Sequence, residues 1–124
     1  MPMEGNFFSN LTVLDFSRYL PGGYATQPFA DWGAEVIKIE DTDQGDFCRH
    51  DPPTRHGISY YSTALCRNKR SVSLNLKDGE VRDLFLHMAS CADVIVRIVF
   101  PSTNVSTDTS RPVINSSTTI RLPA

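Results

Sequence analysis

The sequence predicts an α/β fold with parallel strands. Through residue 100, short apolar or alternating segments that suit strands are interleaved with segments that suit helices. The last apolar segment, ADVIVRIV at 92–99, is almost uninterrupted, as in a strand that is covered on both faces of its sheet. With 40% hydrophobic and 21% charged residues, the 124-residue chain has enough apolar content for one small domain.

The first half of this pattern consists of two strands around a helix. Residues 11–16 (LTVLDF) are apolar and rich in branched side chains, so they suit a buried strand. A turn is expected at Pro21-Gly22-Gly23, followed by a helix over 24–32 that ends at Gly33. Residues 35–40 (EVIKIE) alternate and predict the second strand.

The second half repeats the strand and helix order after a long loop. Residues 41–57 are polar and contain Gly and Pro, so we expect a loop there. Residues 71–76 (SVSLNL) alternate as a strand does, and 78–91 place apolar residues at helical spacing. The strand at 92–99 would complete a parallel sheet with right-handed crossovers.

The composition changes at the end of this pattern and divides the chain into residues 1–100 and 101–124. Ten of the 24 residues in the second segment are Ser or Thr, three are Pro and none is aromatic. Such a segment buries too little apolar surface to offset its ordering entropy, so a disordered C-terminal tail is expected.

Charge and cysteine usage limit the classes of partner and compartment. The net charge of −2 provides no global attraction for nucleic acid or an anionic membrane, and no apolar run has the length of a membrane span. Residues 1–10 do not resemble a signal peptide. Cys48, Cys66 and Cys91 are odd in number and lack zinc-site spacing, so we expect reduced thiols, no metal and a cytoplasmic location.

Three local patterns are candidates for ligand contacts. The glycines of the 21–23 turn precede a helix and would suit an anion, although a tight turn needs glycine for its own geometry. Glu40 ends a strand, as does the acidic residue of a small dinucleotide-binding domain, but the loop is not GxGxxG. The basic segment Arg67–Arg70 suits a phosphate-rich ligand, whereas a solvated loop is the commoner outcome. Asp15, inside an apolar strand, predicts a structural hydrogen bond.

Taken together, four blocks of this chain resemble class III CoA-transferases, the CaiB/BaiF family. They are VLDFSRYLPGGYATQPFADWGAEVIKIE (13–40), GDFCRH (45–50), RNKRSVSLNLK (67–77) and ADVIV (92–96). The resemblance implies a partial Rossmann-like parallel sheet with flanking helices, acyl-CoA as substrate, and two interlocked chains. It also implies CoA transfer from an acyl-CoA thioester to a carboxylic acid through a catalytic aspartate.

The resemblance also suggests which positions contact CoA. Asp41 occupies a position where several family members place an arginine on the CoA nucleotide, and its carboxylate would repel phosphate instead. The full set of cofactor-binding positions implied by the family is Leu20, Pro21, Asp41, Leu74, Asn75, Leu76 and Lys77.

Three departures from the family pattern qualify this expectation. The family's catalytic aspartate lies in a segment that would follow residue 124, and Arg97 to Ser102 replace a continuation that contains an asparagine. Pro28 stands where an aliphatic residue is usual, and it would be tolerated only near the first turn of a helix. We therefore expect an inactive N-terminal fragment that pairs with itself or with a full-length homologue. The alternatives are a non-catalytic interaction module and a small dinucleotide-binding domain.

Overall fold

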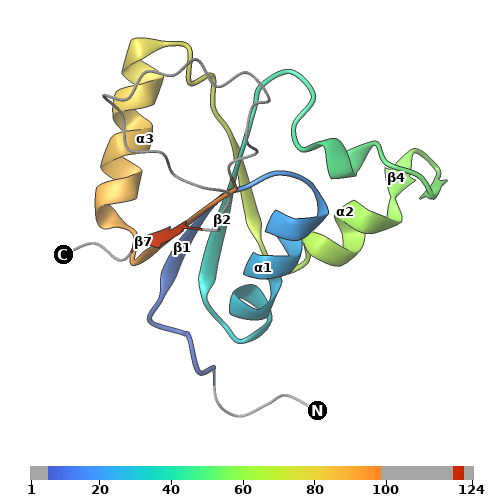
Figure 1. Cartoon of the computed structure of the whole chain (residues 1–124), viewed down its shortest axis with the longest axis horizontal. Coiled ribbons are helices and arrows are strands. Elements are labelled where there is room, and N and C mark those ends of the chain that lie inside the picture. Colours follow the sequence, from blue (N-terminus) through green and yellow to red (C-terminus); the bar gives the residue numbers. More distant parts are fainter. Residues whose placement is uncertain (1–5, 99–118, 122–124) are drawn as a thin grey trace, which may run out of the picture.

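The computed structural model describes residues 6–98 and 119–121, which form a twisted sheet with helices on both faces (Figure 1). Five strands pair in the order β5-β2-β1-β6-β7, and the first four of these run parallel. Their bounds are β1 Thr12–Phe16, β2 Glu35–Glu40, β5 Arg70–Ser73, β6 Val94–Arg97 and β7 Thr119–Arg121. The predicted α/β class with a parallel sheet is confirmed.

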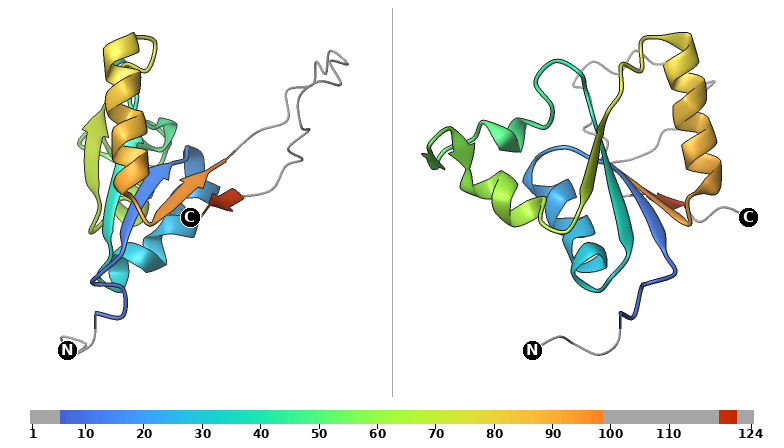
Figure 2. Two further views of the ribbon diagram at one scale, coloured as in Figure 1. Left: turned by 90° about the vertical axis from the view of Figure 1, so that its left-hand side faces the viewer. Right: turned by 180° about the vertical axis from the view of Figure 1, so that it is seen from behind.

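The helices lie on opposite faces of the sheet. Figure 2 shows α1 (Tyr19–Asp31) and α2 (Tyr60–Leu65) on one face and α3 (Gly79–Cys91) on the other. A 3₁₀ helix, η1 (Phe47–Arg49), and a small hairpin of β3 (Thr54–Arg55) and β4 (Ile58–Ser59) connect β2 to α2. The crossover through α3 moves the chain to the far side of β1, so the strand order reverses between β1 and β6.

Two apolar clusters hold the layers together. Under α1, Val13, Val36 and Val94 pack with the alanines of the helix and its exit. On the other face, Leu14 and Ile39 pack against Phe85 and its neighbours on α3. Successive residues of β1 therefore point to opposite cores, and this explains why the strand is an uninterrupted apolar run.

The first helix differs from the prediction at its start. The chain turns at Tyr19, which has a left-handed φ of 61°, two residues before the predicted glycine turn. The Tyr19 amide donates to Asp46 Oδ1 at 3.0 Å, and the Tyr19 ring stacks on Phe47 with centroids 4.8 Å apart. The helix therefore begins at Tyr19, and Pro21–Gly23 lie inside it.

The proline and two glycines of α1 lie in surroundings that differ from those predicted. Pro28 is an exposed residue in the later part of the helix, not in its first turn. Gly22 and Gly23 are buried and allow close packing, because a Cβ on Gly22 would collide with Ser17 and one on Gly23 would lie 3.0 Å from Leu65. Gly33, with φ of 97°, ends the helix as predicted.

The remaining elements follow the predicted order, although several bounds differ. The strand predicted over 71–76 is β5, which ends at Ser73, and the loop predicted over 41–57 contains η1 and β3. The helix predicted over 78–91 is α3, and Asp78 caps it by accepting hydrogen bonds from the amides of Glu80 and Val81. The sequence patterns do not predict the short helix α2. Most of the predicted tail lies outside the described residues, but Thr119–Arg121 form β7, which pairs antiparallel with β6.

No described helix combines the length and apolar character needed to cross a membrane. Within residues 6–98 and 119–121, no group of three or more His, Cys, Asp and Glu side chains is arranged to hold a metal ion.

Candidate functional site

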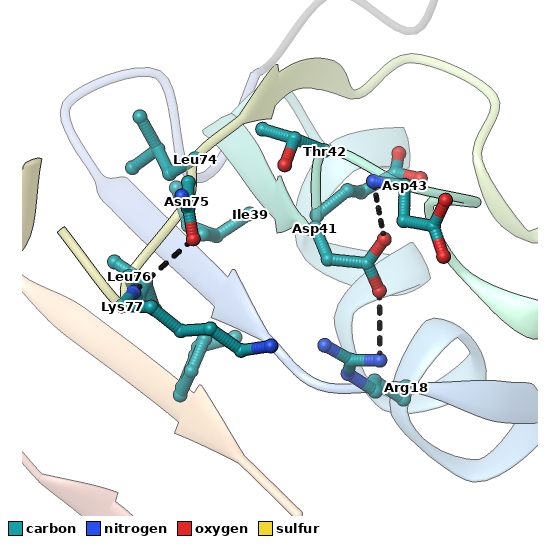
Figure 3. Close-up of a pocket in the computed structure, with 11 residues that line it drawn as sticks. Arg18, Ile39, Asp41, Thr42, Asp43, Leu74, Asn75, Leu76 and Lys77 are labelled. Atoms are coloured by element: carbon teal, nitrogen blue, oxygen red, sulfur yellow. Dashed lines mark hydrogen bonds and ion pairs between the residues drawn. The ribbon is translucent and has the colours of Figure 1, made fainter.

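A cleft of about 470 Å³ opens at the carboxyl ends of β1, β2 and β5 (Figure 3). We call it the strand-end cleft. A second hollow of about 220 Å³ adjoins it and shares Phe16, Arg18 and Ile39. This second hollow extends to Arg97 at the end of β6, where the strand order reverses. Ligands of open α/β sheets bind at this kind of position, because the strand ends and the loops that follow them leave a crevice there.

The strand-end cleft combines an apolar floor with a polar rim. Phe16, Ile39, Leu74 and Leu76 supply the apolar surface, and they belong to the cluster that also packs against α3. The rim carries the charged and polar residues Arg18, Glu40, Asp41, Thr42, Asp43, Asn75 and Lys77. An apolar floor with a few polar groups suits a flat organic ring with polar substituents.

Asp41 is the central acid of the rim, and both of its carboxylate oxygens already have partners within the chain. Its Oδ2 lies 3.0 Å from Arg18 Nη1, and its Oδ1 accepts the amides of Asp43, Gln44 and Gly45 at 2.9–3.0 Å. These backbone hydrogen bonds, with that of Gln44 the strongest, lower the pKa of Asp41, and Arg18 lowers it further. Asp41 therefore fixes the loop after β2 and neutralises Arg18.

Lys77 contributes the other cation of the rim. Figure 3 shows its side chain extending from the stretch after β5 toward the middle of the cleft. Its backbone amide donates to the Asn75 side chain at 3.3 Å, which shapes the turn before α3. Among the described residues, no carboxylate lies within ion-pair distance of the Lys77 amine.

Glu40 lies at the end of β2 and lines the cleft, but its carboxylate is already hydrogen-bonded within the chain. Its side chain is 2% exposed and accepts hydrogen bonds from Arg49 Nε at 2.6 Å, Ser71 Oγ at 2.7 Å and the Asp46 amide at 2.8 Å. Burial alone would raise the pKa of Glu40, but these hydrogen bonds outweigh it and lower the pKa to about 2. The interpretation of Glu40 as a ribose-binding acid is therefore wrong, because both of its oxygens are occupied.

The basic segment 67–70 is likewise occupied by carboxylates of the same chain. Arg67 pairs with Asp31, and Arg70 Nε lies 3.1 Å from Glu35 Oε1. Lys69 is buried, with its amine 3.2 Å from Asp15 Oδ2. None of these residues lines the strand-end cleft, and each cation already has an anionic partner, so the structure gives the phosphate contact predicted at this segment no support.

Asp15 is the centre of a buried polar network. Its carboxylate accepts hydrogen bonds from Ser17, from Thr26 Oγ1 at 2.6 Å and from the Lys69 amine. The buried amine of Lys38 lies 3.9 Å from Asp15 and 2.7 Å from Asp46 Oδ2. The predicted structural role of Asp15 is confirmed, since these contacts join β1, α1 and the segment before β5.

The glycine turn predicted to bind an anion is not a turn, and its amides lie within α1. Leu20 and Pro21 instead line an apolar hollow of about 420 Å³ between α1 and α2. Tyr24, Tyr61, Ala64 and Leu65 complete that hollow. The structure thus separates Leu20 and Pro21 from the strand-end cleft.

Five of the seven predicted cofactor positions meet in the cleft: Asp41, Leu74, Asn75, Leu76 and Lys77. Sequence reasoning missed Phe16, Arg18, Ile39, Thr42 and Asp43, which also line it. A signal was available, because these residues stand at or just after the ends of two predicted parallel strands, where α/β proteins place ligands.

Comparison with known proteins shows what this architecture is similar to. Residues 8–110 match the sequence profile of CoA-transferase family III. A succinyl-CoA:glutarate CoA-transferase of Mus musculus is 37% identical over 101 residues, which cover 81% of this chain and 22% of that protein. A succinyl-CoA:mesaconate CoA-transferase of Haloarcula marismortui is 39% identical over 92 residues, covering 70% of this chain and 23% of the relative.

The structural comparison gives the same result. The crystal structure of a CAIB/BAIF family protein from Brucella suis superposes with a TM-score of 0.65 and 32% sequence identity, covering 72% of this chain and 25% of that one. The chain therefore spans about a quarter of the length of the relatives that it matches. Sequence and structure agree that the chain belongs to CoA-transferase family III.

Proposed function

We propose that this chain supplies the strand-end cleft in which a class III CoA-transferase holds the nucleotide part of acyl-CoA. The observation that carries this proposal is the convergence of Asp41 and the stretch Leu74–Lys77 on one cleft at the ends of parallel strands. The apolar floor suits an adenine ring, and the Lys77 amine suits a phosphate. The whole protein would transfer CoA between an acyl-CoA thioester and a carboxylic acid.

The same geometry predicts weak binding by this chain alone. Arg18 is neutralised by Asp41, so Lys77 is the main cation that the cleft offers to phosphate. We expect a dissociation constant for CoA no tighter than roughly 10⁻⁴ M, or about −5.5 kcal/mol. Binding should weaken as salt is added, because an exposed charge contact is screened.

Calorimetric titration of the full chain with CoA and with NAD tests this proposal. Lys77→Gln should weaken CoA binding about three- to tenfold, the loss of one exposed charge contact to phosphate. Arg55→Gln is the matched control, because Arg55 lies on the exposed β3–β4 hairpin and does not line the cleft. NAD bound more tightly than CoA, or CoA binding that is indifferent to Lys77→Gln, would contradict the proposal.

We also propose that the chain associates with a second copy or with a longer relative. Its support is the apolar surface left exposed around the hollow between α1 and α2, where Tyr24 is 74% and Tyr61 is 38% exposed. On the other face, Leu84 and Leu86 of α3 are at least half exposed. Light scattering over a range of concentrations should show association, and a strictly monomeric chain would contradict it.

A further inference from the structure

The second hollow, which adjoins the strand-end cleft, is lined by two arginines and by no described carboxylate. It measures about 220 Å³, and we call it the arginine hollow. Its lining consists of Phe16, Ser17, Arg18, Ile39, Arg97 and Ile98. Three of these residues also line the strand-end cleft, which in addition carries three carboxylates on its rim. Of the two neighbouring spaces, the arginine hollow is therefore the more favourable one for an anion.

The register of the sheet explains how two arginines that are distant in the sequence line one hollow. In the parallel pairing of β1 with β6, Arg97 lies opposite Phe16, and Arg18 follows Phe16 by two residues. Val96 is buried under α1, and side chains alternate between the two faces of a strand, so Arg97 lies on the opposite face. Phe16 and Ile39 form the apolar floor on that same face. The two arginines therefore flank one apolar floor.

Both guanidinium groups have hydrogen-bond donors available to a ligand. Arg97 is exposed, and within residues 6–98 and 119–121 no carboxylate lies within ion-pair distance of it. The Arg18 side chain is 46% exposed, and Asp41 accepts a hydrogen bond from its Nη1 atom at 3.0 Å. Because a guanidinium group has five N–H donors, Arg18 retains donors for a ligand while it is paired with Asp41.

We propose that the arginine hollow is a second anion subsite, which takes a diphosphate group. Two guanidinium groups match the oxygens of two linked phosphates, and the hollow is larger than a single carboxylate requires. With a ring on the floor of the strand-end cleft, the two spaces form one site for a nucleoside diphosphate. The pairing with a ring rests on the proposed function, whereas the binding of a diphosphate does not. Arg97 belongs to the segment that departs from the family pattern, so the charge of this subsite is particular to this chain.

NMR titrations of the ¹⁵N-labelled full chain with ADP, AMP and inorganic pyrophosphate, at constant ionic strength, test the subsite. ADP should bind about three- to tenfold more tightly than AMP, because its second phosphate reaches a second guanidinium group. The side-chain Nε–Hε signals of Arg18 and Arg97 should shift with ADP and with pyrophosphate, which has no ring. Arg97→Gln should weaken ADP binding to about the level of AMP. Arg55→Gln, on the exposed β3–β4 hairpin and outside the hollow, is the matched control and should leave both affinities unchanged.

The outcomes separate this subsite from the proposed function. CoA binding that Lys77→Gln weakens and Arg97→Gln does not would keep the proposed function and overturn the subsite. Pyrophosphate that shifts the Arg97 signal in a chain that does not bind CoA would support the subsite and contradict the proposed function. Equal affinities of the wild-type chain for ADP and AMP, or an Nε–Hε signal of Arg97 that pyrophosphate leaves unmoved, would overturn the subsite. These wild-type measurements decide the question even if Arg97→Gln fails to fold.

Discussion

The buried carboxylate of Glu40 should contribute a measurable, pH-dependent part of the fold's stability. Its pKa falls from 4.5 to about 2 in the folded chain, and the side chain is 2% exposed. A pKa difference of about 2.5 corresponds to about 3 kcal/mol, at about 1.36 kcal/mol for each pKa unit. Because the folded pKa is depressed, this contribution is fully present above pH ~4.5 and is lost as the pH falls toward ~2.

Glu40→Gln tests this reasoning, because it keeps the shape of the side chain and removes its charge. We expect the free energy of unfolding at pH 7 to fall by about 3 kcal/mol, and the difference from wild type to shrink toward zero near pH 2. Urea unfolding of both proteins from pH 7 to pH 2.5, at constant ionic strength, measures this difference in the free energy of unfolding. Asp46, Asp31 and Asp41 also have lowered pKa values, so the variant itself will still lose stability in acid.

Glu35→Gln is the matched control. Glu35 pairs with Arg70 at 3.1 Å, but the two side chains are 45% and 77% exposed, so its removal should cost less than about 1 kcal/mol. A difference between wild type and Glu40→Gln that stays constant from pH 7 to pH 2.5 would refute the assignment, because a loss of packing does not titrate. A Glu40→Gln variant as stable as Glu35→Gln would refute the magnitude.

Three further changes test the fold and the cleft. Pro28→Ala should stabilise the chain by about 1–3 kcal/mol, since Pro28 is exposed inside α1; an unchanged or lower melting temperature would contradict this. Gly22→Ala should destabilise it by about 1–3 kcal/mol in urea unfolding despite alanine's helix propensity, because the new Cβ collides with buried Ser17. Asp41→Asn keeps an oxygen for the loop amides but releases Arg18, so calorimetry should show CoA bound about three- to tenfold more tightly at low salt.

The elements that sequence reasoning predicted are those whose signal is local. The apolar runs at 11–16 and 92–99 and the alternation at 35–40 mark β1, β6 and β2. The strand predicted over 71–76 ends earlier, at Ser73, because its partner β2 ends at Glu40 and leaves nothing to pair with beyond that residue. The residues that follow then turn into the cleft.

The features that escaped prediction depend on partners far away along the chain. α2 has six residues, too few for an apolar period, and its start depends on a cap from Ser59. The turn before α1 is made by Tyr19 and not by glycine, because Asp46, 27 residues later, accepts its amide hydrogen. A local pattern could therefore indicate that a turn was needed, but not which residue would make it.

Contacts between residues that are far apart along the chain also decide which of the predicted ligand-binding residues line the cleft. Lys69 belongs to the basic segment that suits phosphate, but Asp15, 54 residues earlier, holds it in the buried network. Asp41 and Lys77 line the cleft because they follow strands that end side by side, and strand ends in a parallel sheet face solvent together. Charge in the sequence thus identified cations, whereas sheet topology decides which of them a ligand can reach. The CoA proposal therefore depends on Lys77 and on the state of Arg18, and not on the more basic segment from Arg67 to Arg70.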